Sequence, residues 1–247
     1  MGVAEDSRYM SNDPASIRFF AFNNSHMFPS NILTRSSTPG SDSSSTLNQE
    51  ELQQRRRKRI VVAITGATGA ILGIEVLCAL RKLNVETHLV ISKWGDATIK
   101  YETDYEPRNV RALADYVHNI NDMAAPISSG SFRADGMIVV PCSMKTLAGI
   151  SSGFCDDLIC RTADVMLKER RRLVLVARET PLSDIHLKNM LTVSQSGAII
   201  FPPVPAYYIK PSSVQDLVAQ TVGRILDLFD LDTGEFSRWE GWQKSKE

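Results

Sequence analysis

The stretch that decides the fold is RIVVAITGATGAILGIEVLCALRKL, from Arg59 to Leu83. It opens with a short run of β-branched and apolar residues, which is typical of a buried strand. The chain then passes through the glycine-containing loop TGATG and continues with apolar residues at helical spacing. A strand that leads through glycines into a helix predicts an α/β fold, with a ligand-binding loop between the two elements.

The same alternation of apolar runs and helix-like segments continues along the rest of the chain. Further strands are predicted at 85–92, 136–141, 172–177 and 197–202, and helices near 70–83, 93–101, 109–120, 157–169, 185–194 and 212–228. The strands are continuously apolar, which favours a parallel sheet covered by helices on both faces. Ligands of such sheets bind outside the carboxyl ends of the strands, so residues that directly follow a strand are the candidates for function.

The composition is that of an ordinary globular protein with a net charge near zero. Lys and Arg together number 28, as do Asp and Glu, so the balance favours neither nucleic acid nor an acidic surface as a partner. The apolar runs fall short of the roughly 18 residues that span a bilayer, so no membrane span is expected. The 4 cysteines form no C-x-x-C pair, which argues against a zinc site and fits mostly buried thiols in a reducing compartment.

The first part of the chain differs in composition from the rest. Residues 1 to about 54 are rich in Ser, Asn, Thr and Pro and are predicted to be disordered. Residues 14–41 lack acidic residues and contain IRFFAF, a partial match to an amphipathic mitochondrial presequence, although acidic residues stand at the very start of the chain. A mitochondrial location is expected, and a plain disordered tail on a cytoplasmic protein is the alternative.

The domain boundaries follow from this change in composition. A disordered extension, which includes the possible presequence, is placed at 1–58, a folded domain at 59–240 and a short tail at 241–247. The basic run RRRKR at 55–59 adjoins the first strand and is either a processing or import signal or a solvated basic linker.

The loop after the first strand fits neither common phosphate-loop pattern. Gly66 and Gly69 allow the backbone to approach a ligand closely, and the next helix offers N–H groups and a positive dipole end. The loop has no Lys of a Walker A sequence, and its glycine spacing differs from G-x-G-x-x-G. It either binds a phosphate or a flavin, or it is a tight turn without a ligand.

Polar residues also follow the second and third strands. Ser92 either caps the next helix or binds a ligand group, and Glu102 is either a solvated carboxylate or a group for proton transfer. Ser143 and Thr146 stand where a helix is expected to start, again with free N–H groups. Cys142 directly precedes them and is interpreted as a buried thiol rather than a nucleophile.

The fourth and fifth strands are followed by RETP and by PAYYIKP. Arg178 and Glu179 form either a structural ion pair or a phosphate-binding and proton-transfer pair. His186 is interpreted as a packed or capping residue. Tyr207 and Tyr208 either offer a hydroxyl to a phosphate or pack together as an aromatic pair.

Several of these motifs resemble the UbiX/Pad family of flavin prenyltransferases. The resemblance lies in TGATG, ISK, PCSMKTLAGISSG, DDLICRTADVMLKERRRLVLVARETPLSDIHLKNM and YYIKPSSVQDLV, and it covers about Arg59 to Trp239. It implies a flavodoxin-like Rossmann three-layer fold with a parallel sheet, assembled as a homododecamer. It also implies that dimethylallyl phosphate or diphosphate prenylates reduced FMN at N5 and C6 without a metal, and that the prenylated FMN serves a UbiD-type decarboxylase.

The resemblance also implies roles for individual residues. Binding of FMN falls to Gly66, Ala67, Thr68, Ser92, Ser143, Met144, Lys145, Thr146 and Arg178. Binding of the prenyl phosphate falls to Tyr208 and Arg224, and catalysis to Glu179, Glu102, Lys168 and Trp239. Two residues depart from the family pattern, because Thr68 replaces a frequent Ser and Met123 stands where bacterial relatives often have Trp.

Two other functions remain open on the sequence. A decarboxylase of cysteine-containing substrates from the same flavoprotein group would carry a histidine in the helix after the first strand, and this chain has none there. A non-catalytic FMN-binding or regulatory subunit would not need its phosphate-pocket residues. The chain retains all five of them, which favours the enzyme: Lys168, Arg178, Glu179, Tyr208 and Arg224.

Overall fold

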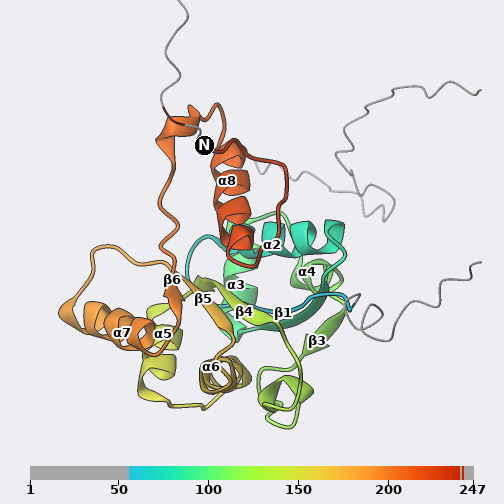
Figure 1. Ribbon diagram of the computed structural model, residues 1–247, viewed down its shortest axis with the longest axis vertical. Helices are drawn as coiled ribbons and strands as arrows, with labels where there is room; N and C mark the ends of the chain where they lie inside the picture. Colours follow the sequence, from blue (N-terminus) through green and yellow to red (C-terminus); the bar gives the residue numbers. More distant parts are fainter. Residues whose placement is uncertain (1–55, 240, 242–247) are drawn as a thin grey trace, which may run out of the picture. The chain divides into compact units, whose positions relative to one another are not determined.

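The computed structural model describes residues 56–239 and residue 241 (Figure 1). The predicted disordered extension with its presequence match, and nearly all of the predicted tail, lie outside the described residues. Within the described ranges, no helix combines the length and the apolar character needed to cross a bilayer.

The strands form one six-stranded sheet in which each neighbouring pair is parallel. The strand order is β3-β2-β1-β4-β5-β6, the order of doubly wound nucleotide-binding sheets, so the direction of winding reverses between β1 and β4. The strands are β1 Arg59–Ile64, β2 Glu86–Ile91, β3 Tyr116–His118, β4 Gly136–Cys142, β5 Arg172–Ala177 and β6 Ile199–Ile200. The predicted parallel sheet is confirmed.

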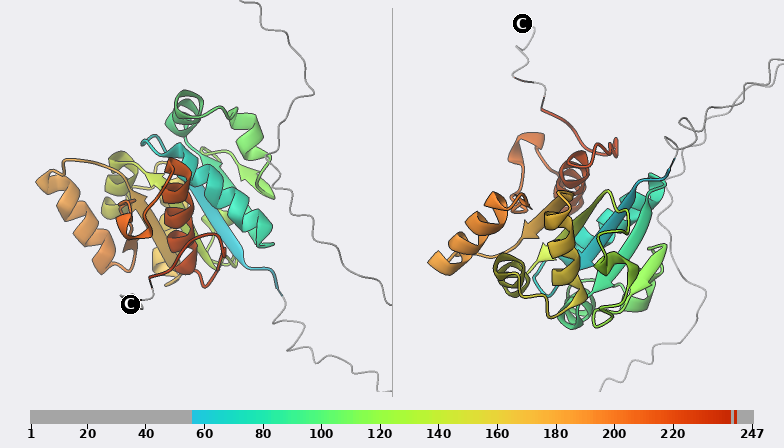
Figure 2. Two further views of the ribbon diagram at one scale, coloured as in Figure 1. Left: turned by 90° about the horizontal axis from the view of Figure 1, so that it is seen from above. Right: turned by 60° about the horizontal axis from the view of Figure 1, so that its bottom comes forward.

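Helices cover both faces of the sheet, as predicted, and give three layers (Figures 1 and 2). The α-helices are α2 Ala70–Lys82, α3 Lys93–Glu102, α4 Pro107–Arg111, α5 Met144–Ser152, α6 Leu158–Lys168, α7 Asp184–Gln195 and α8 Val214–Asp227. Side chains of β1 alternate between the two cores: Ile60, Val62 and Ile64 pack with α2 and α8, whereas Val61 and Ala63 pack with α5 and α6. Because both faces are covered, β1 is almost wholly buried.

The predicted helix over 109–120 is wrong. The helix α4 ends at Arg111, and Tyr116–His118 instead adds the edge strand β3 beside β2. Asp115 fixes this pairing, because its carboxylate accepts hydrogen bonds from the Thr87 N–H at 2.8 Å and the Thr87 hydroxyl at 3.1 Å. A tertiary contact of this kind is invisible in local sequence periodicity, so the edge strand could not be predicted.

The sixth strand exists but is shorter than the predicted 197–202. Only Ile199–Ile200 pair with β5. The next residues include Pro202, Pro203 and Pro205, which have no N–H to donate to a sheet. The chain therefore leaves the sheet early and crosses to α8 as an extended loop that carries the short 3-10 helix η2, Tyr207–Ile209.

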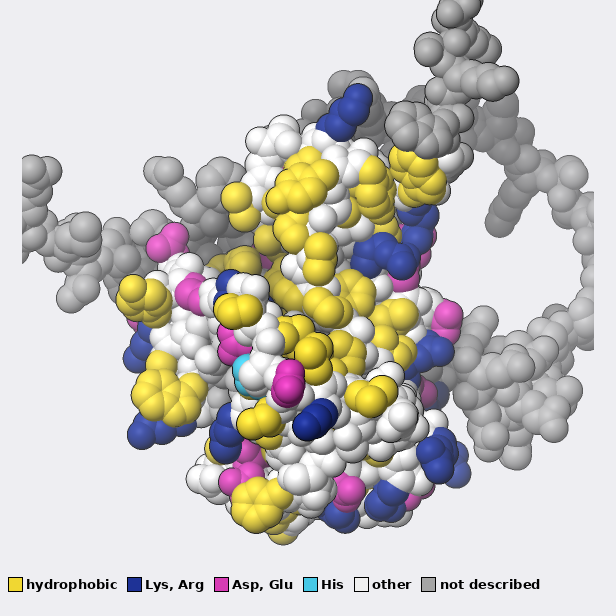
Figure 3. Space-filling view, turned by 90° about the vertical axis from the view of Figure 1, so that its left-hand side faces the viewer, with side chains coloured by type: hydrophobic (Ala, Val, Ile, Leu, Met, Phe, Trp, Pro, Cys, Tyr) yellow, Lys and Arg dark blue, Asp and Glu magenta, His cyan; other side chains and the backbone are white. Residues whose placement is uncertain are grey.

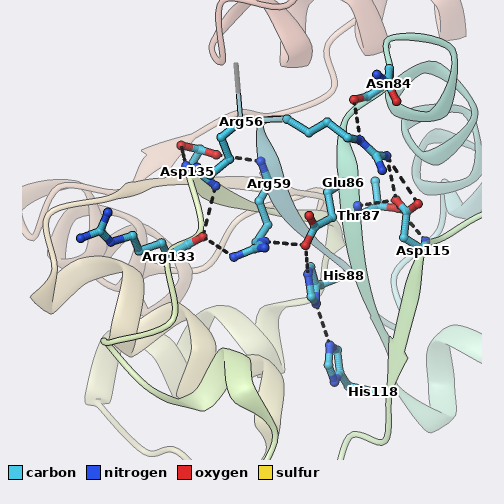
Figure 4. A network of polar contacts seen from close by, with 11 residues as sticks. Arg56, Arg59, Asn84, Glu86, Thr87, His88, Asp115, His118, Arg133 and Asp135 are labelled. Carbon is cyan, nitrogen blue, oxygen red and sulfur yellow. Dashed lines mark hydrogen bonds and ion pairs between the residues drawn. The ribbon is translucent and has the colours of Figure 1, made fainter. Parts of the chain in front are cut away.

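A chain of polar contacts joins the amino ends of β1 and β2 (Figure 4). The Glu86 carboxylate accepts from the Arg59 guanidinium at 2.5 Å and lies 3.0 Å from Nε2 of His88. On the other side of the His88 ring, Nδ1 lies 3.0 Å from Nε2 of His118. Since the carboxylate only accepts, the His88 Nε2–H donates to it, and His88 Nδ1 accepts from His118. Every group in this chain of contacts has a partner.

Candidate functional site

The two glycines of the first loop are required by the protein's own geometry. A Cβ on Gly66 would lie 2.3 Å from Cβ of Trp94, so only glycine allows the loop to pack on the first turn of α3. Gly69 precedes α2 with φ 98°, in the left-handed region that favours glycine. Between them Ala67 and the exposed Thr68 form the crest of the loop. In the described part of the chain, no protein group accepts from the N–H groups of residues 66–68, which leaves these donors for a ligand.

The Glu102 carboxylate occupies the amino terminus of α2. Its Oε2 accepts from the N–H of Gly69 at 2.8 Å and from the N–H of Ala70 at 3.0 Å. The expectation that this helix start offers free N–H groups is therefore wrong for these two residues. The reading of Glu102 as a merely solvated carboxylate is also wrong, because these two hydrogen bonds hold it beside the flavin loop predicted from the sequence.

The loops after β1 and β4 are hydrogen-bonded to each other where the strand order reverses. The Thr65 hydroxyl donates to the Pro141 carbonyl at 2.7 Å and accepts from the Ser143 N–H at 2.8 Å. The Ser143 hydroxyl in turn caps α5, accepting from the Thr146 N–H at 3.4 Å. The carboxyl ends of these two strands thus form one rigid platform at the place where doubly wound sheets bind ligands.

The capping interpretations of two further residues are confirmed. Ser92 caps α3, and its hydroxyl accepts from the Gly95 N–H at 2.9 Å. His186 forms a capping box with Ser183 at the start of α7. Met144 and Lys145 lie in the first turn of α5, where Lys145 is 75% exposed and faces Asp156 and Asp157 at 3.9 and 3.8 Å.

Arg178 lines a cavity of about 270 Å³ together with Thr68 and Gly69. Its backbone N–H is bound to the Cys142 carbonyl at 3.2 Å, which fixes it to the end of β4. Among the described residues, no carboxylate forms an ion pair with its guanidinium, so the alternative of a structural pair with Glu179 is wrong. Arg178 therefore lines the cavity and carries charged donors that no described carboxylate uses.

The remaining walls of this cavity are largely apolar and come from two other segments. They comprise Ile71 and Leu72 of α2, Pro203 and Pro205 of the extended loop, and Leu217, Val218 and Thr221 of α8. Apolar walls, a cation that no described carboxylate pairs with, and a loop whose N–H groups have no described acceptor suit a flat aromatic ring system that carries a phosphate. The site therefore fits a mononucleotide such as FMN.

A second group of predicted residues gathers around α8. The rings of Tyr208 and Trp239 meet edge to face, with centroids 5.7 Å apart, whereas Tyr207 is 74% exposed. The interpretation of Tyr207 and Tyr208 as a packed pair is therefore wrong, because Tyr208 packs on Trp239 instead. Arg224 forms an ion pair with Asp227 at 2.9 Å on the same helix.

Three residues of this group were missed by sequence reasoning. Asp227 accepts from both Arg224 and Arg238, which ties the carboxyl-terminal segment to α8, and these hydrogen bonds hold the pKa of Asp227 below its ordinary value. Gln220 donates to the Tyr208 hydroxyl. The spacing of Arg224 and Asp227 on a helix could have indicated their pair, but Arg238 lies too far along the chain for any local pattern.

Lys168 does not lie with the other predicted residues. It ends α6, before β5 begins, and its ammonium donates to the neighbouring Glu169 carboxylate. The 6 residues of β5 then separate it from Arg178, and at about 3.3 Å per residue this is a distance of about 20 Å. Within one chain, Lys168 lies near the amino edge of the sheet and Arg178 at the carboxyl edge.

The cysteines carry no sign of reactivity. Cys142 is wholly buried, and burial raises the pKa of its thiol to about 12, which confirms the interpretation as a buried thiol. Cys160 lies with Asp156 and Asp157 in a group whose candidate ligand atoms are within 4.8 Å of one another. The Asp157 carboxylate is engaged as the cap of α6, and burial raises the pKa of Cys160 as well.

Comparison of the sequence with known proteins finds a flavoprotein family model and similar flavin prenyltransferases. Residues 48–226 match the family model described as Flavoprotein. The chain is 64% identical over 183 residues to the flavin prenyltransferase PAD1, mitochondrial, of Saccharomyces cerevisiae, which covers 74% of this chain and 76% of the yeast protein.

Solved structures agree with the sequence relatives. A crystal structure of AnUbiX (PadA1) in complex with FMN and dimethylallyl pyrophosphate is 81% identical, with a TM-score of 0.76, covering 76% of this chain and all (100%) of that one. A dodecameric FMN-dependent UbiX-like decarboxylase from Escherichia coli O157:H7 is 58% identical, with a TM-score of 0.73, and covers 74% of this chain and 100% of its own.

Proposed function

The chain belongs to the UbiX/Pad family of flavin prenyltransferases, and we propose that it prenylates reduced FMN with dimethylallyl phosphate or diphosphate. The C1–O bond of the donor breaks as C1 bonds to flavin N5, and the phosphate leaves. A proton then adds to C2 of the prenyl group, which makes C3 electrophilic. C3 bonds to flavin C6, C6 loses its proton, and a fourth ring closes. The product, prenylated FMN, is the cofactor of a UbiD-type decarboxylase.

The observation that carries this proposal is that Arg178, whose guanidinium pairs with no described carboxylate, lines the cavity beside the loop at residues 66–68. Ionisation of an allyl phosphate is accelerated by donors that take up the negative charge growing on the leaving group. The flavin supplies the nucleophilic ring atoms, and the protein supplies donors, orientation and exclusion of water.

The residues around α8 complete the proposed donor site. Tyr208 and Arg224 donate to the departing phosphate, and the apolar part of the allyl group lies against the indole of Trp239. An aromatic face stabilises the positive charge that develops on the allyl carbons. The proline-rich loop and α8 form apolar walls of the cavity, and such walls exclude the water that would capture this cation.

Two carboxylates are proposed to handle protons. Glu102 is held beside the flavin loop by its contacts to Gly69 and Ala70, so it is positioned to manage the proton at the flavin ring. Glu179 directly follows Arg178, and its carboxylate accepts only from the N–H of Thr180 at 3.0 Å among the described residues. It is the proposed acceptor of the C6 proton or the donor to the leaving phosphate.

The FMN-binding roles of the capping residues rest on the family pattern. Ser92, Ser143 and Thr146 already serve the protein as caps or capped residues, and their oxygens have further acceptor capacity toward a ligand. Met144 and Lys145 occupy the adjoining first turn of α5. Thr68 is exposed at the crest of its loop, so the extra methyl group relative to Ser has space.

Two features are accounted for if copies of the chain associate. Lys168 lies far from Arg178 within one chain, and one face of the molecule exposes apolar side chains. Figure 3 shows hydrophobic side chains gathered across one face of the molecule. The exposed apolar residues of α7 and of the extended loop include Ile185, Leu187, Leu191 and Val204. We propose that a homododecamer, as described for the Escherichia coli relative, buries such apolar surface and brings Lys168 of one copy to the cavity of another.

A mitochondrial location is proposed from the yeast relative, which is named mitochondrial. The signal would lie in residues 1–58, outside the described part of the chain apart from Arg56–Lys58. Fusing 1–58 to a fluorescent protein tests this directly, since diffuse cytoplasmic fluorescence would contradict it.

The experiment that tests the reaction is an anaerobic incubation of the protein with reduced FMN and either donor, analysed by mass spectrometry. The expected product is a flavin heavier by one prenyl unit. The description of the Escherichia coli relative as a decarboxylase is the reason for a second arm, in which release of carbon dioxide from a cysteine-containing peptide is measured without a prenyl donor. Carbon dioxide release without prenylated flavin would favour the decarboxylase, and neither product would favour a non-catalytic FMN-binding subunit.

A further inference from the structure

Gln220 is a buried amide on a helix face that otherwise packs into the core. It is 5% exposed, and Val218, Val222 and Ile225 of the same helix are buried around it. A buried amide needs a hydrogen-bond partner, and among the described residues its amide donates to one group, the hydroxyl of Tyr208, at 3.3 Å. The hydrogen-bonding group at position 220 is therefore directed at the hydroxyl of Tyr208.

The direction of this hydrogen bond matters for the chemistry of Tyr208. Because the Gln220 N–H donates, it occupies a lone pair of the phenol oxygen and leaves the phenol hydrogen unused. No described residue accepts that hydrogen. A hydroxyl that accepts one hydrogen bond also becomes a stronger donor in the next.

The ring of Tyr208 is held from a second side. Trp239 meets it edge to face at a centroid distance of 5.7 Å and an interplanar angle of 74°. This contact fixes the ring, and the Gln220 contact fixes the free direction of the hydroxyl. We infer that Gln220 is a positioning residue for prenyl transfer, which turns the Tyr208 hydrogen toward the departing phosphate.

This inference rests on the proposed function and on the role of Tyr208 in it. Three variants follow from it, each assayed for kcat/KM of dimethylallyl phosphate at saturating reduced FMN. Tyr208→Phe removes the donor and lowers kcat/KM about tenfold or more, the size of a hydrogen bond to a charged group. Gln220→Leu keeps the hydroxyl but frees its orientation, and lowers kcat/KM about threefold to tenfold.

Gln220→Glu is the most informative variant, because the carboxylate has the same shape as the amide but cannot donate. The Tyr208 hydroxyl must then donate its hydrogen to the Glu carboxylate, so it can no longer donate to the phosphate. The expected loss in kcat/KM is at least that of Tyr208→Phe. If Gln220 had a purely structural role, Gln220→Leu and Gln220→Glu would lower kcat/KM by similar factors. Each loss would then follow the fall in melting temperature of the same variant.

Two controls separate orientation from general damage. Gln215→Leu lies on the same helix at an exposed position and should leave kcat/KM and FMN affinity unchanged. In the Tyr208→Phe background, Gln220→Leu should change kcat/KM by less than about twofold, because the group it orients is gone. The Kd for FMN and the melting temperature of Gln220→Leu should equal those of the parent protein.

The assays distinguish three ways in which the inference can be wrong. If the parent protein makes no prenylated flavin, the proposed function is wrong. If it does, but Tyr208→Phe keeps full kcat/KM, the role of Tyr208 is wrong. If Tyr208→Phe is impaired while Gln220→Leu and Gln220→Glu are not, or if the two losses add fully in the double variant, the positioning role of Gln220 is overturned.

Discussion

The carboxyl and amino edges of the sheet use polar side chains in opposite ways. From the amino edge inward, Arg59, Glu86, His88 and His118 form a continuous chain of contacts in which each group has a partner (Figure 4). At the carboxyl edge, Arg178 has no charged partner in the described part of the chain and faces a cavity. Partnered groups stabilise the fold, whereas unpartnered donors that face a cavity are available to a ligand.

This difference predicts how the two edges respond to substitution. Changes to Arg178 and Glu179 should remove activity and leave stability intact, because few internal contacts are lost there. Changes to Arg59, Glu86 and His88 should lower stability and leave the chemistry intact. Four variants or conditions test this separation.

The largest effect is expected from Glu179→Gln at the carboxyl edge. The amide cannot transfer a proton, so the rate of prenyl transfer should fall about 10²-fold to 10⁴-fold. Binding of FMN should be retained, since the shape and hydrogen-bonding of the side chain toward Thr180 are similar. Single-turnover kinetics and fluorescence titration of FMN measure the two quantities, and unchanged turnover would remove Glu179 from the mechanism.

Arg178→Ala should lower kcat/KM about 10²-fold to 10³-fold, as does the loss of other donors to developing charge. The free energy of unfolding should change by no more than about 0.5 kcal/mol, because no internal ion pair is broken. Arg133→Ala, an exposed arginine near the amino edge, is the matched control and should leave kcat/KM unchanged. A large loss of stability in Arg178→Ala would mean that this arginine is structural after all.

Glu86→Gln tests the amino edge. Glu86 and Arg59 are only 18% and 23% exposed, so loss of the charge weakens a partly buried pair and its contact to His88. The free energy of unfolding should fall by about 2 kcal/mol, measured by urea denaturation. Prenyl transfer at low temperature should keep the parent kcat, and a selective loss of kcat without loss of stability would contradict the separation of the edges.

The smallest effect is expected from pH. Burial lowers the pKa of both His88 and His118 below the ordinary value, so the unfolded chain takes up protons more readily than the folded protein. The free energy of unfolding should therefore fall as the pH drops from 7 through the ordinary histidine range toward 5. His88→Phe should flatten this slope, and stability that rises on acidification would contradict the account.

Much of the fold could be predicted from the sequence, for identifiable reasons. The strands β1, β2, β4 and β5 are continuous apolar runs with clear boundaries, and four helices begin at capping serines that local patterns can indicate. The edge strand β3 could not be predicted, because it depends on the pairing of Asp115 with Thr87 across 28 positions of sequence.

The candidate site was predictable in its residues but not in its geometry. Strand-end positions and the family resemblance indicated Gly66, Ser92, Ser143 and Arg178. The sequence could not show that Glu102 fills the start of α2, that Tyr208 packs on Trp239 across the extended loop, or that Lys168 lies at the far edge. Each of these facts depends on contacts between segments that are distant along the chain.

The most direct test of the difference between the two edges is amide hydrogen exchange with and without FMN. Binding at the carboxyl edge should slow exchange at residues 66–72 and 143–147, whose N–H groups lie in and beside the two connected loops, and leave 84–87 and 113–116 at the amino ends of β2 and β3 unchanged. Slowed exchange confined to 84–87 and 113–116 would place the ligand on the other side of the sheet and contradict the account.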